Sequence, residues 1–185
     1  MRRMMLAVLL LLTVASGTSV SCVGKTLFLG VTPNQHEMLL AEMISVLVSE
    51  RTGTTVKILQ FRDVRSLYNA VNKGEVGLIV ESTERAAGIV GKGKDATGRA
   101  AYDAMKSEYR KSMNLIWLDP IGGTSVTAPV ISVETVSNLP ALPKLINKLS
   151  NTFTEDMYAK VVKSARSDQK PNKNARDFLK SKKLR

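Results

Sequence analysis

Residues 74–83 read GEVGLIVEST, a glycine turn followed by a short apolar strand that ends in the carboxylate of Glu81. One helix earlier, the segment Asn34-Gln35-His36-Glu37 opens the first predicted helix. In an open α/β sheet, the loops that follow neighbouring parallel strands lie side by side and commonly hold a ligand. The two segments together therefore predict a site for a small molecule at one end of a sheet.

Apolar patterns along the chain predict alternating strands and helices. The first helix has a capping-box spacing, Asn34 followed by Glu37, and Gly53 ends it, while Asp63 is expected to cap the second. This order predicts a mostly parallel sheet flanked by helices, in the α/β class. Residues 88–98 read as a loop. Strands are expected at 25–31, 54–59, 76–80, 115–118 and 128–133, and later helices at 97–112, from Pro140 or Pro143 to 151, from Thr154, and from Asn172 or Asn174.

The beginning of the chain has the layout of an export signal. Arg2 and Arg3 precede an apolar run at 6–12 that is too short to span a bilayer, and small residues follow. We therefore expect a signal peptide at 1–22 and one globular domain at 23–185, located in the periplasm or at the cell envelope. Cys22 is the only cysteine, so no intramolecular disulfide can form. It fits lipidation of a lipoprotein or ordinary cleavage after Ser21, and we favour cleavage.

The net charge of +11 is concentrated in the last part of the chain. Residues 160–185 contain ten Lys or Arg against two acidic residues. The basic residues recur at helical spacing without interleaved aromatic residues, which favours a solvated helix face over nucleic-acid binding.

The side-chain inventory argues against an enzyme. With one histidine and one cysteine, the chain lacks the parts for Cys–His catalysis or a His/Cys metal site, so we expect no catalytic residue, metal or cofactor. His36 at a helix start is either a donor to a ligand anion or a plain exposed residue, and we favour the latter. Glu81 fits a ligand-orienting group and a solvated loop acid equally well.

The order of these segments resembles the substrate-binding proteins of glycine betaine, choline and related quaternary-amine ABC transporters. The resemblance lies in GVTPNQHEMLLAEMISVLVSERTG, GEVGLIVEST, AYDAMKSEYRKSMNLIWLDPIG and the closing segments from APVISVET to NARDFLKSKKL. It implies a periplasmic binding protein-like fold, a noncatalytic role, a quaternary-amine solute and an ABC permease as partner. The ligand-binding residues it implies are Thr32, Asn34, Gln35, His36, Glu81, Thr83 and Pro120.

The chain departs from this family in two ways. Only residues 119–127 separate the strands at 115–118 and 128–133, where the family has a second lobe, so a single lobe is expected. Ile79 and Ser82 stand where the family often has tyrosine, which argues against an aromatic cage for a quaternary ammonium. An alternative function is therefore an extracytoplasmic interaction protein that binds a partner protein or forms a homodimer. Five of the aromatic residues, Phe28, Phe61, Tyr102, Tyr109 and Trp117, are expected to pack in the core or between helices.

Overall fold

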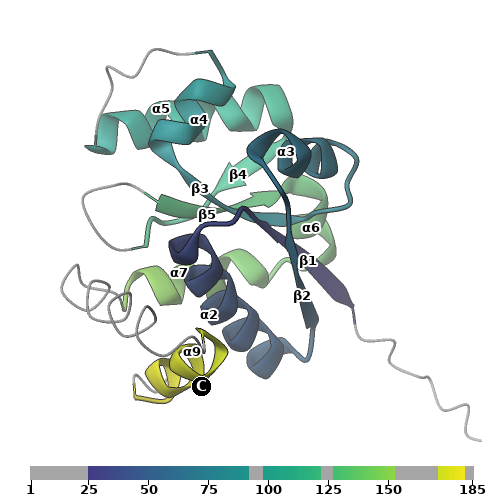
Figure 1. Cartoon of the computed structure of the whole chain (residues 1–185), viewed down its shortest axis with the longest axis vertical. Helices are drawn as coiled ribbons and strands as arrows, with labels where there is room; N and C mark the ends of the chain where they lie inside the picture. The colour runs from purple at the N-terminus through teal and green to yellow at the C-terminus, as the bar shows by residue number, and fades with distance from the viewer. Residues whose placement is uncertain (1–24, 92–97, 122–126, 153–170, 182–185) are drawn as a thin grey trace, which may run out of the picture.

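The computed structural model of the chain describes residues 25–91, 98–121, 127–152 and 171–181 (Figure 1). The strands are β1 (Thr26–Val31), β2 (Thr55–Gln60), β3 (Leu78–Ser82), β4 (Leu115–Trp117) and β5 (Thr127–Ser132). The helices are α2 (Gln35–Thr52), α3 (Val64–Asn72), α4 (Thr83–Ile89), α5 (Gly98–Met113), α6 (Val133–Asn138), α7 (Leu142–Ser150) and α9 (Pro171–Ser181).

The five strands form one sheet in the order β2-β1-β3-β5-β4, which confirms the expected strands and their common sheet. β1 is parallel to β2 and β3, whereas β5 is antiparallel to β3 and β4. Residues 118–126 between β4 and β5 are too few for the crossover that a parallel pair requires, so β5 returns in the opposite direction. The part of the sheet formed by β1, β2 and β3 is thus parallel, as predicted.

The start of α2 differs in detail from the expected capping box. Asn34 caps the helix, because its side chain accepts from the N–H groups of His36 and Glu37. The Glu37 carboxylate does not return to the N–H of Asn34 but bonds to Thr32. Gly53 ends the helix in the left-handed conformation, with φ 69°, as the sequence predicts. The cap of α3 by Asp63 is also confirmed, here as a capping box with Ser66.

Helices cover both faces of the sheet (Figure 1). On one face, α2 packs against α7 and α9 and contributes more residues than any other element to a large apolar core. On the other face, α3, α4 and α5 enclose a second core that includes Tyr102, Tyr109 and Trp117. The predicted C-terminal helix is confirmed in α9, whose Ala175 and Leu179 are buried. The helix expected from Thr154 and most of the basic segment at 160–185 lie outside the described residues.

Three expectations need correction. β3 spans Leu78–Ser82 and thus begins and ends two residues later than expected, although Gly77 before it already donates to the Phe28 carbonyl oxygen of β1. Thr83 is the first residue of α4 rather than part of a loop, since Ser82 caps a short helix that the sequence pattern did not indicate. Phe28 is 37% exposed and is not a core residue, because its neighbours Leu27 and Leu29 take the buried positions of β1.

None of the helices within the described ranges is long and apolar enough to cross a membrane.

Candidate functional site

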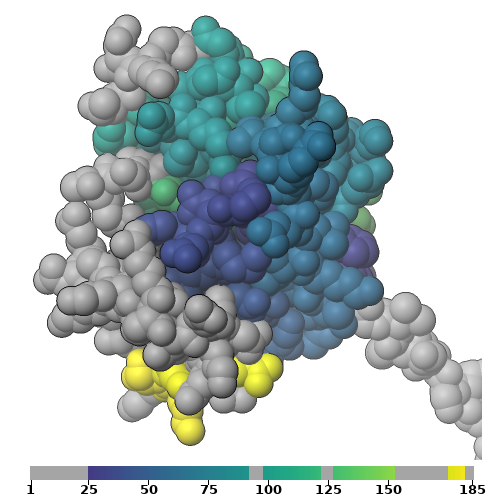
Figure 2. Space-filling view, viewed as in Figure 1, coloured from purple at the N-terminus to yellow at the C-terminus, as the bar shows by residue number. Residues whose placement is uncertain are grey.

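The carboxyl ends of β1 and β3 lie next to each other in the sheet. The two strands pair in parallel, with Gly30 opposite Ile79. The chain turns from β1 into α2 and from β3 into α4 at the same end, which confirms that the two loops share one edge. We call this end of the sheet the ligand edge. Figure 2 shows the purple and dark blue atoms of the α2 region in the centre of one face, beside the teal atoms that follow β3.

Arg85 on α4 joins the two loops. Its Nη1 donates to Glu37 Oε1 at 2.5 Å, and its Nε donates to Glu81 Oε1 at 2.6 Å. Its Nη2 donates to the carbonyl oxygen of Val80 at 2.7 Å. Glu37 is held on its other side by Thr32, whose N–H and Oγ1 donate to Oε2 at 2.8 and 2.9 Å. One guanidinium on α4 therefore connects the β1–α2 loop, α2 and β3.

Glu81 is completely buried, at 0% exposure, so the interpretation as a solvated loop acid is wrong. Its Oε1 accepts from the Ser82 N–H at 2.7 Å as well as from Arg85, and its Oε2 accepts from the Tyr68 hydroxyl. The Tyr68 hydroxyl also lies 2.7 Å from that of Tyr109. Both carboxylate oxygens are thus engaged by donors from within the chain. A direct contact between Glu81 and a ligand stays a prediction.

The protonation of this cluster follows from burial and from its charges. Burial raises the pKa of the Glu81 carboxyl group, and the Arg85 charge only partly opposes this effect. Burial also raises the pKa of the Tyr68 hydroxyl, and the negative charge of Glu81 adds to the rise. For Arg85, burial lowers the pKa, but the carboxylates of Glu81 and Glu37 more than compensate and its pKa is raised. Arg85 is therefore a permanent cation and Tyr68 a neutral hydrogen-bond donor.

The other residues predicted at the site have different positions. Thr32 belongs to the Arg85 cluster, and Asn34 is the α2 cap. Gln35 is exposed at the first turn of α2, and the neighbouring His36 is partly buried. Thr83 is partly buried at the start of α4, and Pro120 is partly buried after β4. Thr32 and Glu81 are thus brought into one network, whereas no contact between Pro120 and that network is described.

Sequence reasoning missed Arg85 and Tyr68. Arg85 follows Glu81 by four residues, but Glu81 lies at the end of β3 and Arg85 on α4, so the pair is not the ion pair of one helix face that this spacing would indicate. Tyr68 lies on α3 at an apolar position of the helical pattern, and that pattern does not indicate a polar role for it. Its role depends on the burial of Glu81, for which the local sequence carries no signal.

The aromatic residues near the sheet are used for packing. Tyr102, Tyr109 and Trp117 are buried, as predicted, and Trp117 makes edge contacts with both tyrosine rings at centroid distances of 5.8 and 5.4 Å. The Tyr102 hydroxyl donates to the Leu118 carbonyl oxygen at 2.8 Å. These ring faces are therefore not available to a cation at the ligand edge. In the described part of the chain, no three His, Cys, Asp or Glu side chains gather in a way that could hold a metal ion.

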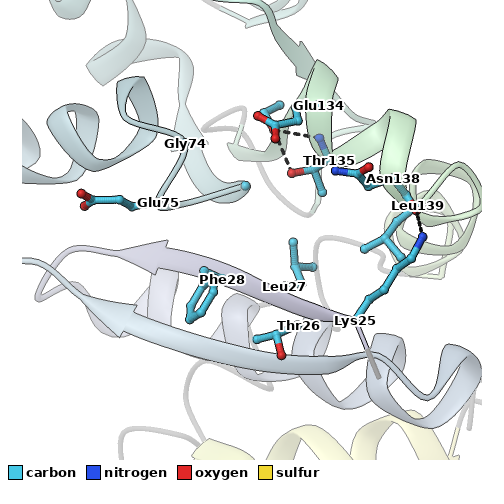
Figure 3. A pocket seen from close by; sticks show the side chains of 12 residues that line it. Lys25, Thr26, Leu27, Phe28, Gly74, Glu75, Glu134, Thr135, Asn138 and Leu139 are labelled. Atoms are coloured by element: carbon cyan, nitrogen blue, oxygen red, sulfur yellow. Dashed lines mark hydrogen bonds between the residues drawn. The ribbon is translucent and has the colours of Figure 1, made fainter. Parts of the chain in front are cut away.

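A separate cavity of about 400 Å³ lies at the opposite end of β1 (Figure 3). Phe28 and Glu75 line one side, and Thr135 and Asn138 of α6 line the other. Lys25, which also lines the cavity, donates to the Asn138 carbonyl oxygen at 2.6 Å. This cavity contains none of the residues that the sequence predicts as ligand contacts.

Comparisons with known proteins agree with this architecture. No curated protein gives a significant match. Among solved structures, a glycine betaine/carnitine/choline ABC transporter protein has 11% identity and a TM-score of 0.78, over 87% of this chain and 99% of that chain. Apo YehZ from Escherichia coli has 12% identity and a TM-score of 0.78, over 86% and 99% of the two chains. Lactococcal OpuAC with bound glycine betaine has 10% identity and a TM-score of 0.54, over 86% and 96%. At these identities the likeness shows a shared fold, which is that of periplasmic binding proteins.

The family described as the substrate binding domain of the ABC-type glycine betaine transport system matches residues 25–135. The match covers more than half of the chain and includes both loops of the ligand edge. The chain therefore belongs to the family of substrate-binding domains of ABC-type glycine betaine transport systems.

Proposed function

We propose that the chain is a noncatalytic solute-binding component of an ABC-type importer for glycine betaine-like or choline-like osmoprotectants. The observation that carries the proposal is the junction of the β1–α2 and β3–α4 loops at one sheet end, where open α/β sheets bind ligands. The family match supports the same solute class and an ABC permease as the recipient. The proposed ligand contacts are Thr32, Asn34, Gln35, His36, Glu81, Thr83 and Pro120.

The proposed binding surface is half of a cleft. Residues 118–126 connect β4 directly to β5, which leaves no room between these strands for the second lobe of a two-lobed binding protein. Small-molecule sites usually bury most of the ligand surface. We therefore propose that the isolated lobe binds quaternary amines weakly and that a second copy of the chain completes the site.

A second candidate function is that of an extracytoplasmic protein that uses the same scaffold to bind a partner protein or its own copy. The engagement of both Glu81 oxygens by donors of this chain favours this candidate, because three donors already occupy three of the about four acceptor sites of that buried carboxylate. In this case the ligand edge would be a protein interface.

Isothermal titration with glycine betaine and choline at several protein concentrations, combined with light scattering, tests both candidates. The solute-binding proposal expects affinity to rise with protein concentration as dimers form, because ligand binding and association are thermodynamically linked. Dimers without any heat of solute binding would favour the interaction protein. Tight one-to-one binding to a confirmed monomer would refute the half-cleft argument.

A pair of variants locates the site in the same experiment. Gln35→Trp places a bulky side chain at the exposed start of α2 and should weaken solute binding. Lys111→Trp makes the same change at the exposed end of α5 and should leave binding unchanged. Equal effects of the two variants would show that the ligand edge is not the binding site.

We further propose that the protein works outside the cytoplasm after cleavage of its signal peptide, so that the exported chain begins at or just before Cys22. Binding proteins of ABC importers act in the periplasm or outside the cytoplasmic membrane, and the charged start and apolar run support export. Lipidation at Cys22 is the alternative to simple cleavage, and it would anchor the protein to the membrane.

A further inference from the structure

The surroundings of the Arg85 guanidinium are made almost entirely of hydrogen-bond acceptors. Glu37 Oε1, Glu81 Oε1 and the Val80 carbonyl oxygen lie 2.5, 2.6 and 2.7 Å from its nitrogens. The Thr32 hydroxyl oxygen lies 3.5 Å from Nη1. These acceptors come from the β1–α2 loop, α2 and β3, whereas the cation comes from α4. The acceptors thus converge on one point from segments far apart in the sequence.

Each carboxylate is also positioned by donors other than Arg85. The N–H and hydroxyl groups of Thr32 hold Glu37, and the Tyr68 hydroxyl and the Ser82 N–H hold Glu81. Glu37 and Glu81 are 7% and 0% exposed, and both lie on elements fixed by the core. Removal of the Arg85 side chain would therefore leave an acceptor-lined space with two carboxylates already in place.

We propose that the space between Glu37 and Glu81 is a binding site for a planar organic cation with N–H donors, which the chain fills with its own Arg85. In this arrangement Arg85 is a positioning residue: it acts as a tethered ligand that holds the two loops of the ligand edge together. The acceptors need N–H donors, because a buried acceptor left without a donor is costly. A quaternary ammonium has no N–H group, so the space that Arg85 fills selects against it.

Rescue of Arg85→Ala by an added cation tests the proposal. Removal of one partner from a buried ion pair should lower the Tm by about 6–20 °C in a chain of this size. Millimolar methylguanidinium should then raise the Tm of Arg85→Ala by several degrees but not that of the unmodified protein. Tetramethylammonium at equal ionic strength should have no effect. Arg62→Ala is the matched control, because Arg62 pairs with Asp63 at the surface, with its side chain 92% exposed.

The proposal is overturned if Arg85→Ala has the Tm of the unmodified protein, if methylguanidinium gives no rescue, or if tetramethylammonium rescues equally well. If Arg85→Ala does not fold by itself, it is refolded from denaturant with and without methylguanidinium. Recovery of the folded circular dichroism signal only with methylguanidinium supports the proposal, and no recovery with the ion overturns it. The solutes of the proposed importer are not used in these measurements, so this inference and the proposed function can fail independently.

Discussion

Tyr68→Phe should be the most informative conservative change in the buried cluster. The Tyr68 hydroxyl contacts two groups, the Oε2 of Glu81 and the hydroxyl of Tyr109 at 2.7 Å. Glu81 and Tyr109 are both 0% exposed, so water cannot replace the missing partner. Loss of the Tyr68 hydroxyl removes a hydrogen bond to the Glu81 carboxylate and leaves the buried Tyr109 hydroxyl without this partner. We expect the free energy of unfolding to fall by about 2–4 kcal/mol, or the Tm by about 4–16 °C.

Tyr109→Phe provides the comparison. It removes the same contact between the two hydroxyls but leaves the bond from Tyr68 to Glu81 intact, so the cost should be only about 0.5–1.5 kcal/mol. The double variant lacks the Tyr109 hydroxyl that Tyr68→Phe alone leaves without its Tyr68 partner, so it should be no less stable than Tyr68→Phe. Such non-additivity is expected for residues of one hydrogen-bond network.

Urea denaturation followed by circular dichroism measures these differences, and unchanged m-values would show that the variants unfold in the same way. A Tyr109→Phe variant that loses as much stability as Tyr68→Phe would contradict the assignment of Tyr68 as the central donor. Fully additive losses in the double variant would show that the two hydroxyls do not form one network.

Three further predictions concern the core, the alkaline limit and export. Gly30→Ala should lower the free energy of unfolding by about 1–3 kcal/mol through overpacking, because its new Cβ would overlap Leu67 Cδ1. Gly88→Ala in α4 should raise it by about 0.5–1 kcal/mol, because its new Cβ meets nothing within 4 Å. Equal denaturation midpoints of the two variants would contradict this packing around Gly30. Burial raises the pKa of the Tyr68 and Tyr109 hydroxyls above the ordinary value of 10.0. The unfolded chain therefore loses these protons first, and stability that is intact below pH 10 declines above it. In the folded protein, at most half of the four tyrosines should ionise near pH 10 by ultraviolet absorbance, and a full transition without unfolding would refute their burial. The intact mass of envelope-purified protein should correspond to a chain that begins at or just before Cys22; a full-length species would exclude cleavage, and added acyl mass would establish lipidation.

The sequence alone was sufficient for the five strands, for most of the longer helices and for the parallel pairing of β1 with β2 and β3, but not for the short helices α4 and α6. Asn34, Gly53 and Asp63 mark helix ends by interactions with residues at most four positions away, so their signals are local. The alternation of strands and helices in turn predicts a parallel sheet and places the β1–α2 and β3–α4 loops at one end of it. The order of motifs also pointed to the family before any packing was known.

Only the tertiary structure decided what lies at that end of the sheet. The Glu37–Arg85 pair joins residues 48 positions apart, and the Tyr68–Tyr109 contact joins residues 41 apart. Such contacts depend on which helix covers which face of the sheet, and no local pattern encodes that choice. Glu81 shows this: from the sequence it fits a ligand-orienting group and a solvated acid equally well. Only the packing of α3, α4 and α5 over β3 makes it a buried partner of Arg85.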